Sequence, residues 1–144
     1  MNLFFDTSVL VAAFVQTHPH YSPAFTALEL VRTQEHQGWI SQHTVAEVYA
    51  TLTALPVHPR IYPSLALRIL EDNVLPYCQV VTLDPGDYRV VIRDLAAKDW
   101  RSGKIFDALH LHCAKKQPID RIYTFNVRDF RQLAPELQDK IAAP

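Results

Sequence analysis

The segment Asn2-Leu3-Phe4-Phe5-Asp6-Thr7-Ser8 places a short apolar run directly before one acidic residue and two hydroxyl side chains. A run of this length, bounded by a turn signal, predicts a buried β-strand that ends just before Asp6. In an open α/β sheet, ligands bind at the carboxyl ends of the strands. Asp6 is therefore a candidate functional residue, and other acidic residues that reach the same edge decide whether a site exists there.

Along the rest of the chain, short apolar segments of strand length alternate with longer segments in which apolar residues recur at helical spacing. We expect further strands at residues 39–41, 78–83 and 121–125, and helices at residues 9–14, 22–37, 44–55, 64–75, 85–100 and 104–116. Ser22 and Asp84, each followed by proline, are the predicted N-caps of two helices, and Gly38 is predicted to end the second helix. Strands that alternate with helices indicate a three-layer α/β/α fold with a mainly parallel central sheet.

Length and composition limit the class of protein. The chain has 144 residues, 49% hydrophobic and 20% charged, which suits a single globular domain over residues 1–144. Cys78 and Cys113 lie far apart, so neither a disulfide framework nor a Cys-based zinc site is indicated. The longest apolar stretch, residues 8–15, is too short to cross a bilayer, and we expect a cytoplasmic protein with no membrane association.

The charge pattern is uneven along the chain. The net charge of −1 argues against the strongly basic surface of a general nucleic-acid binder. Residues 73–144 nevertheless carry eleven Lys and Arg against nine acidic residues. A phosphate-facing surface is therefore expected from the basic residues of this half: Arg89, Arg93, Lys98, Arg101, Lys104, Arg128 and Arg131.

Three more acidic residues fall where the predicted topology can bring them to Asp6. Glu47 lies in the helix after the second strand, Asp107 in a largely apolar helix, and Asp129 after the last strand. Most of them also have a purely structural explanation. Asp6 can cap a helix, Glu47 can complete a capping box with Thr44, and Asp129 can simply be exposed. Asp107 is harder to explain, because a buried carboxylate is costly unless it is paired or bound to a metal.

A divalent-metal site explains the four carboxylates together. Oxygen ligands without Cys or paired His favour Mg²⁺ or Mn²⁺ over zinc, and such a cation would offset the repulsion between the acids. It would also support phosphodiester hydrolysis by an activated water, without a covalent nucleophile. Thr7 and Ser8 could bind water or phosphate, or only form the turn. His110 and His112 are expected to be structural, because no second His follows at the spacing typical of a metal pair.

Four segments resemble, in order, motifs of the PIN-domain nucleases, and most closely those of VapC toxins from toxin–antitoxin pairs: residues 4–10, 44–48, 103–109 and 124–130. The resemblance implies a compact α/β/α fold and Mg²⁺- or Mn²⁺-dependent endoribonuclease activity on single-stranded or loop RNA. It assigns Asp6, Glu47 and Asp107 to the three core acidic positions. Family members carry either Asp at the position of Asn126, or Asn there and an acid three residues later, as with Asp129 here.

The same resemblance implies partners. Members of the family frequently form homodimers, and a small cognate antitoxin protein inhibits them. We expect both surfaces on the helical hairpin of residues 44–75 and the groove beside it, since an amphipathic partner helix could bury its apolar side there. Truncation of Val48 or Leu52 is the sequence-based test of that surface.

Alternative functions remain open from the sequence. A haloacid-dehalogenase-type phosphatase needs a second Asp two residues after Asp6, where this chain has Ser8. A response-regulator receiver needs an acidic pair and a phosphorylatable Asp after a middle strand, where Asp84 is better explained as a cap. A PIN-like fold with a silent site could serve as an RNA- or protein-binding module, and metal binding without RNA cleavage would favour that reading.

Overall fold

A five-stranded, fully parallel sheet forms the middle of the computed structural model, which describes residues 1–144. The strand order is β3-β2-β1-β4-β5. The strands are β1 (Asn2–Phe5), β2 (Gln37–Ser41), β3 (Cys78–Val81), β4 (Arg121–Tyr123) and β5 (Ile141–Ala142). The predicted α/β/α fold with a parallel sheet is confirmed.

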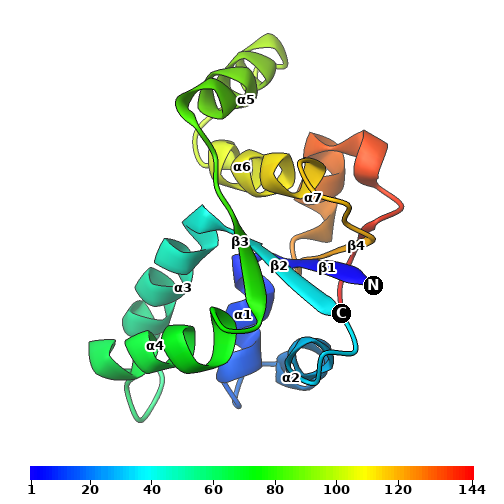
Figure 1. Cartoon of the computed structure of the whole chain (residues 1–144). Helices are drawn as coiled ribbons and strands as arrows, with labels where there is room; N and C mark the ends of the chain where they lie inside the picture. The colour runs from blue at the N-terminus through cyan, green and yellow to red at the C-terminus, as the bar shows by residue number, and fades with distance from the viewer.

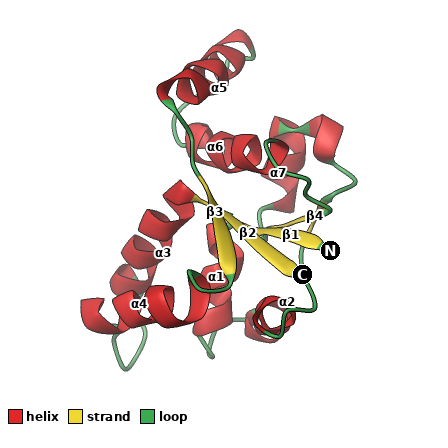
Figure 2. Cartoon of the chain, viewed as in Figure 1, coloured by secondary structure: helices red, strands yellow, loops and turns green.

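Helices cover both faces of the sheet (Figure 1). Below it in that view lie α1 (Thr7–Phe14), α2 (Tyr21–Arg32), α3 (Gln42–Ala54) and α4 (Pro63–Ile69), the last of which continues as a π-helical turn, Leu70–Val74. Above it lie α5 (Pro85–Ala97), α6 (Lys104–Lys115) and α7 (Val127–Leu133), followed by a 3₁₀ turn, Pro135–Leu137. Figure 2 shows the same three layers, with α5 outermost beyond α6. None of these helices combines the length and hydropathy needed to cross a bilayer.

The first strand divides the core into two halves. Leu3 and Phe5 pack into one apolar cluster with α1 to α4, whereas Phe4 packs into a second cluster with α5 to α7. All three side chains are fully buried. Successive side chains of a strand point to opposite faces, and a strand covered on both faces is apolar throughout. The continuous apolar run that predicted the strand therefore also reports its central place in the sheet.

Several predicted boundaries are wrong around the second strand. Gly38 does not end a helix: α2 stops at Arg32, and Gly38 lies inside β2. A Cβ atom at this position would lie 2.7 Å from Val31 Cγ1 and 2.8 Å from Cys78 Sγ, so glycine is required by close packing. Ser22 is not an N-cap either, because α2 begins one residue earlier, at Tyr21.

The predicted capping box of Thr44 and Glu47 is also wrong. Ser41 is the N-cap of α3, and its Oγ accepts the Thr44 N–H at 3.0 Å. The cap predicted at Asp84 is confirmed, and Asp87 completes a reciprocal capping box there. Strand β5 was not predicted, because two residues are too few to show a pattern; it pairs with β4 through Ile122 and Ile141.

The two cysteines are free and buried, as expected from their spacing. Burial raises the pKa of each thiol, Cys78 and Cys113, to about 12. Both therefore stay protonated at neutral pH and pack as small apolar groups.

Candidate active site

The strand order reverses between β1 and β4. From β1 the chain proceeds outward through β2 and β3 on one side, while β4 and β5 lie on the other. Asp6 follows β1 directly, and its backbone N–H donates to the Tyr123 carbonyl of β4 at 3.0 Å. The carboxyl ends of the two strands therefore meet at a topological switch point, the usual place for a ligand in an open α/β sheet.

Asp6 is held by hydroxyl groups from both strand ends. Its carboxylate is 5% exposed, and Oδ2 accepts the hydroxyls of Ser8 at 2.7 Å and Thr124 at 2.9 Å. Although Asp6 precedes α1, its side chain makes no capping bond to that helix. The capping explanation therefore does not apply, and the other oxygen, Oδ1, lies 3.9 Å from His110 Nε2.

Glu47 reaches the same edge from α3. Its Oε1 accepts the Thr7 hydroxyl at 3.0 Å and the His110 Nε2–H at 2.5 Å. Burial raises the pKa of Glu47, but the hydrogen bond and charge of His110, together with the Thr7 hydrogen bond and the charge of His43, hold the pKa below its usual value. An ionised carboxylate only accepts hydrogen bonds, so Nε2 carries the imidazole proton.

His110 is the residue whose role the sequence did not reveal. It is 1% exposed, and its Nδ1 lies 2.7 Å from Ser41 Oγ, the N-cap of α3. The imidazole thus bridges the N-cap of α3 to the Glu47 carboxylate in the second turn of that helix. His110 was expected to be structural, and the structure shows in addition that it contacts a carboxylate of the pocket.

Asp107 faces Asp6 from α6. Burial and the negative charge of Asp6 raise the pKa of Asp107 to about 6. The Asn126 amide, which follows β4, donates from Nδ2 to Asp107 Oδ2 at 3.1 Å. A negative charge beside a carboxylate favours its protonated form, whereas a bound cation would favour the ionised form of both Asp6 and Asp107.

These side chains line one pocket with a volume of about 600 Å³. Its polar lining contains three of the four predicted acids and all three predicted supporting residues: Asp6, Glu47, Asp107, Thr7, Ser8 and Asn126. A second hollow, of about 660 Å³, lies between α3, α5 and the β3 edge, and its lining contains no acidic residue. The acidic candidate residues therefore lie in the first pocket and not in the second.

Asp129 is placed differently from the other acids. It lies in α7 and forms an ion pair with Lys104 Nζ at 2.8 Å, which lowers the pKa of Asp129. It does not line the pocket, although its charge contributes to the raised pKa of Asp107. Its role as a fourth metal ligand stays a prediction.

The donor chemistry fits a hard divalent cation. Carboxylate oxygens of Asp6, Glu47 and Asp107 and the amide oxygen of Asn126 share the pocket, and these are the oxygen ligands that such cations prefer. The side chains are spread around the pocket, and no three Asp, Glu, His or Cys residues are gathered as a ready-made metal-binding group.

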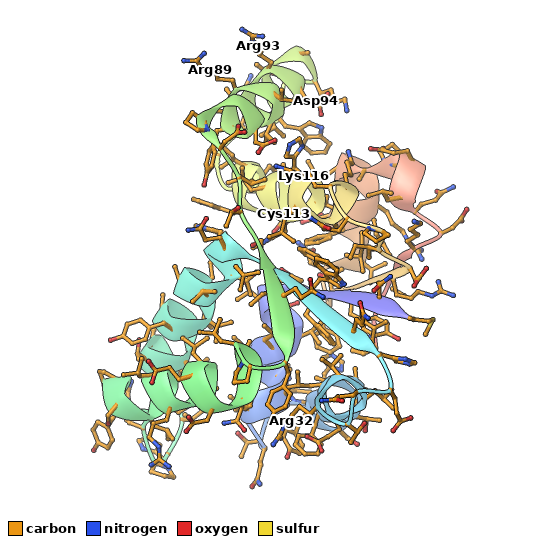
Figure 3. The ribbon with its side chains drawn as sticks, in the orientation of Figure 1. Arg32, Arg89, Arg93, Asp94, Cys113 and Lys116 are labelled. Atoms are coloured by element: carbon orange, nitrogen blue, oxygen red, sulfur yellow. The ribbon has the colours of Figure 1, made fainter.

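Some residues of the predicted basic surface form ion pairs with acidic neighbours. Lys98 pairs with Asp94 and Arg101 with Asp99, in each case with 3.2 Å between nitrogen and oxygen. Arg89 and Arg93 project from the outer face of α5, away from the rest of the molecule (Figure 3). Lys98 and Arg101 are therefore paired with acids of their own segments, and a shared phosphate-facing surface stays a prediction.

The chain belongs to the PIN-domain family, whose model matches residues 3–135. Ribonuclease VapC40 of Mycobacterium tuberculosis is 34% identical over 104 residues, which is 72% of either chain. The structure is similar to that of VapC20 of Mycobacterium tuberculosis, a toxin that cleaves the sarcin-ricin loop, with a TM-score of 0.66 and 19% sequence identity. The match covers 88% of this chain and 92% of the VapC20 chain. It is also similar to VapBC2 of Rickettsia felis bound to a promoter DNA fragment, with a TM-score of 0.63, 19% identity and coverage of 92% and 93%.

The predicted membership of the PIN-domain family, with a VapC ribonuclease as a relative, is confirmed. The match of the PIN-domain model to residues 3–135 places the chain in a different family from the phosphatase and receiver alternatives.

Proposed function

We propose that this protein is a divalent-metal-dependent endoribonuclease that acts as the toxin of a toxin–antitoxin pair. One observation carries the proposal. The carboxylates of Asp6, which follows β1, of Glu47 in α3 and of Asp107 in α6 line one polar pocket at the switch point of the sheet. The hydroxyls of Thr7 and Ser8 donate to Glu47 and Asp6, so they support these carboxylates as ligands. Hydrolysis by an activated water is the chemistry that fits.

Asp6, Glu47 and Asp107 would hold the cation, with Asn126 beside them, and we assign it as Mg²⁺ or Mn²⁺ from the oxygen-only donor set. When bound, the cation supplies a more acidic water and offsets the charge of the phosphate in an in-line displacement. Whether Asp129 completes the set depends on release of its ion pair with Lys104.

The remaining polar residues orient the carboxylates. Thr7 donates to Glu47 and Ser8 donates to Asp6, so adjacent hydroxyls of the same turn fix acids from two different elements. Thr124 fixes Asp6 from the β4 side. Such bonds to the ligands maintain their orientation for metal binding before substrate arrives.

The partner proposals are an RNA substrate, a cognate antitoxin protein and a second copy of the chain. The helical hairpin of residues 44–75 exposes apolar side chains suited to a partner helix: Tyr49, Tyr62, Leu65 and Leu67, which are 41–68% exposed. Val48 and Leu52, chosen from the sequence as test positions, are fully buried, so their truncation would test folding instead. Leu65→Asp and Leu67→Asp are the informative variants, and light scattering of the purified chain tests the homodimer.

The activity is tested by incubating the purified protein with a structured RNA pool and Mg²⁺ or Mn²⁺. Cleavage that is lost both in Asp6→Asn and with a chelator would support the proposal, because removing a ligand or the cation disables the same step. Cleavage that survives Asp6→Asn would contradict the assigned site. Calorimetric binding of Mn²⁺ without any RNA cleavage would support the alternative of a silent PIN-like binding module.

A further inference from the structure

One wall of the acidic pocket consists of stacked rings. His18 and His20, from the connection between α1 and α2, and Phe125, which follows β4, all line the pocket. The ring centroids of His20 and Phe125 are 4.5 Å apart with planes at 19°, which is a close stack. His18 lies 6.3 Å from Phe125 and 5.8 Å from His20. We refer to these three residues as the ring wall.

The ring wall is fixed relative to the carboxylates. The backbone N–H of Phe125 donates to Ser8 Oγ at 3.1 Å, and Ser8 Oγ in turn donates to Asp6 Oδ2 at 2.7 Å. The next residue, Asn126, donates to Asp107. The ring of Phe125 is thus joined through its own backbone and that of its neighbour to two of the acids.

The two ends of the ring wall differ in burial. Phe125 is half-buried and packs against the first core cluster, which gives the wall a rigid base. His20 is exposed, and no side-chain hydrogen bond or ion pair engages its imidazole. An exposed planar ring held in a stack beside a hydrolytic pocket is well suited to receive another planar ring.

Planar rings of this kind bind unpaired nucleobases. Proteins that bind single-stranded RNA stack its bases on Phe, Tyr, Trp or His, because every base has a π-face and stacking tolerates all four bases. A paired base cannot reach such a wall, since its faces are covered by neighbouring base pairs. Asp6, Asp107 and the ring wall line the same pocket, so a phosphodiester placed at these acids has its adjacent nucleotide beside the rings.

We propose that the ring wall of His18, His20 and Phe125 is a nucleobase subsite, in which an unpaired base next to the cleaved phosphate stacks. The subsite selects unpaired RNA and aligns the strand over the carboxylates. This inference rests on the proposed endoribonuclease function and adds a substrate-binding element to it.

The test measures RNA binding separately from cleavage. All variants carry Asp6→Asn to prevent hydrolysis, and binding of a fluorescein-labelled, 12-nucleotide random-sequence RNA is followed by fluorescence anisotropy in Mg²⁺. His20→Ala removes the exposed ring, His20→Trp restores a larger one, and Tyr88→Ala removes an exposed aromatic residue that does not line the pocket. Because His20 is exposed, its substitutions are not expected to disturb folding, which circular dichroism verifies.

The expected result is that His20→Ala weakens binding about 5- to 100-fold, the range for loss of one stacked base, whereas His20→Trp binds at least as tightly as the parent. Tyr88→Ala should bind as the parent does, and a duplex of the same length should bind weakly to all variants. Equal binding by His20→Ala and the parent would overturn the subsite while leaving the proposed function intact. Absence of RNA binding by the parent, together with absence of cleavage by the unmodified protein, would overturn both.

Discussion

His110 offers the sharpest test of how the pocket is organised, because its imidazole bonds to Glu47 and lies 3.9 Å from Asp6 without lining the pocket itself. His110→Ala removes a hydrogen bond to an ionised carboxylate and one to the buried Ser41 hydroxyl. A hydrogen bond to a charged group contributes about 1.5–3 kcal/mol, so the free energy of unfolding should fall by about 2–4 kcal/mol once the lost packing is included. Chemical denaturation measures this change.

The same substitution should weaken metal binding. Residues that orient metal ligands typically cost about 10- to 100-fold in affinity when removed, so the Kd for Mn²⁺ should rise by that factor in isothermal titration calorimetry. His110→Gln retains an N–H donor at similar reach and should recover part of the affinity. His112→Ala is the matched control, since His112 lies two residues further along the same helix and contacts Asp87 outside the pocket.

Wild-type Mn²⁺ affinity in a folded His110→Ala variant would refute the positioning role. A loss of affinity no greater than that of His112→Ala would refute it equally, because the effect would then follow from general destabilisation of α6. Recovery by His110→Gln would separate the hydrogen bond to Glu47 from the packing of the ring.

Three further predictions follow from individual contacts. Because the pKa of Asp107 is raised to about 6, Mn²⁺ binding must displace a proton from this carboxyl group at lower pH. The affinity for Mn²⁺ should therefore rise about tenfold per pH unit below pH 6 and level off above it. An affinity that does not change with pH in calorimetry would contradict this prediction. Gly38→Ala should lower the free energy of unfolding in urea by about 1–3 kcal/mol, since its Cβ would lie 2.7 Å from Val31 Cγ1, and unchanged stability would show that the neighbours move aside. Asp129→Asn should weaken Mn²⁺ binding less than Asp107→Asn does, because Asp129 is paired with Lys104, and an equal loss would establish it as a ligand.

The sequence was sufficient where the physical cause is local. The apolar run of β1 predicted a strand because a strand buried on both faces has no polar positions. Asp84 was recognised as a cap because a capping residue bonds to the backbone only three positions away. Asp6 and Asp107 were found as candidates since an acid at a strand end, or in an apolar helix, is conspicuous without knowledge of its neighbours.

Tertiary structure decided everything that depends on partners distant in the chain. Glu47 was equally compatible with a capping box and with the pocket until His110, 63 residues away, was seen to hold it. Gly38 resembled a helix stop, and only the contact with Val31 and Cys78 shows that it is needed for packing. The ring of Phe125 reaches the pocket because Ser8, 117 residues earlier, bonds to its backbone. Spacing along the chain records which residues share an element, whereas the meeting of two elements is set by core packing, and for that reason the acids could be predicted but their partners could not.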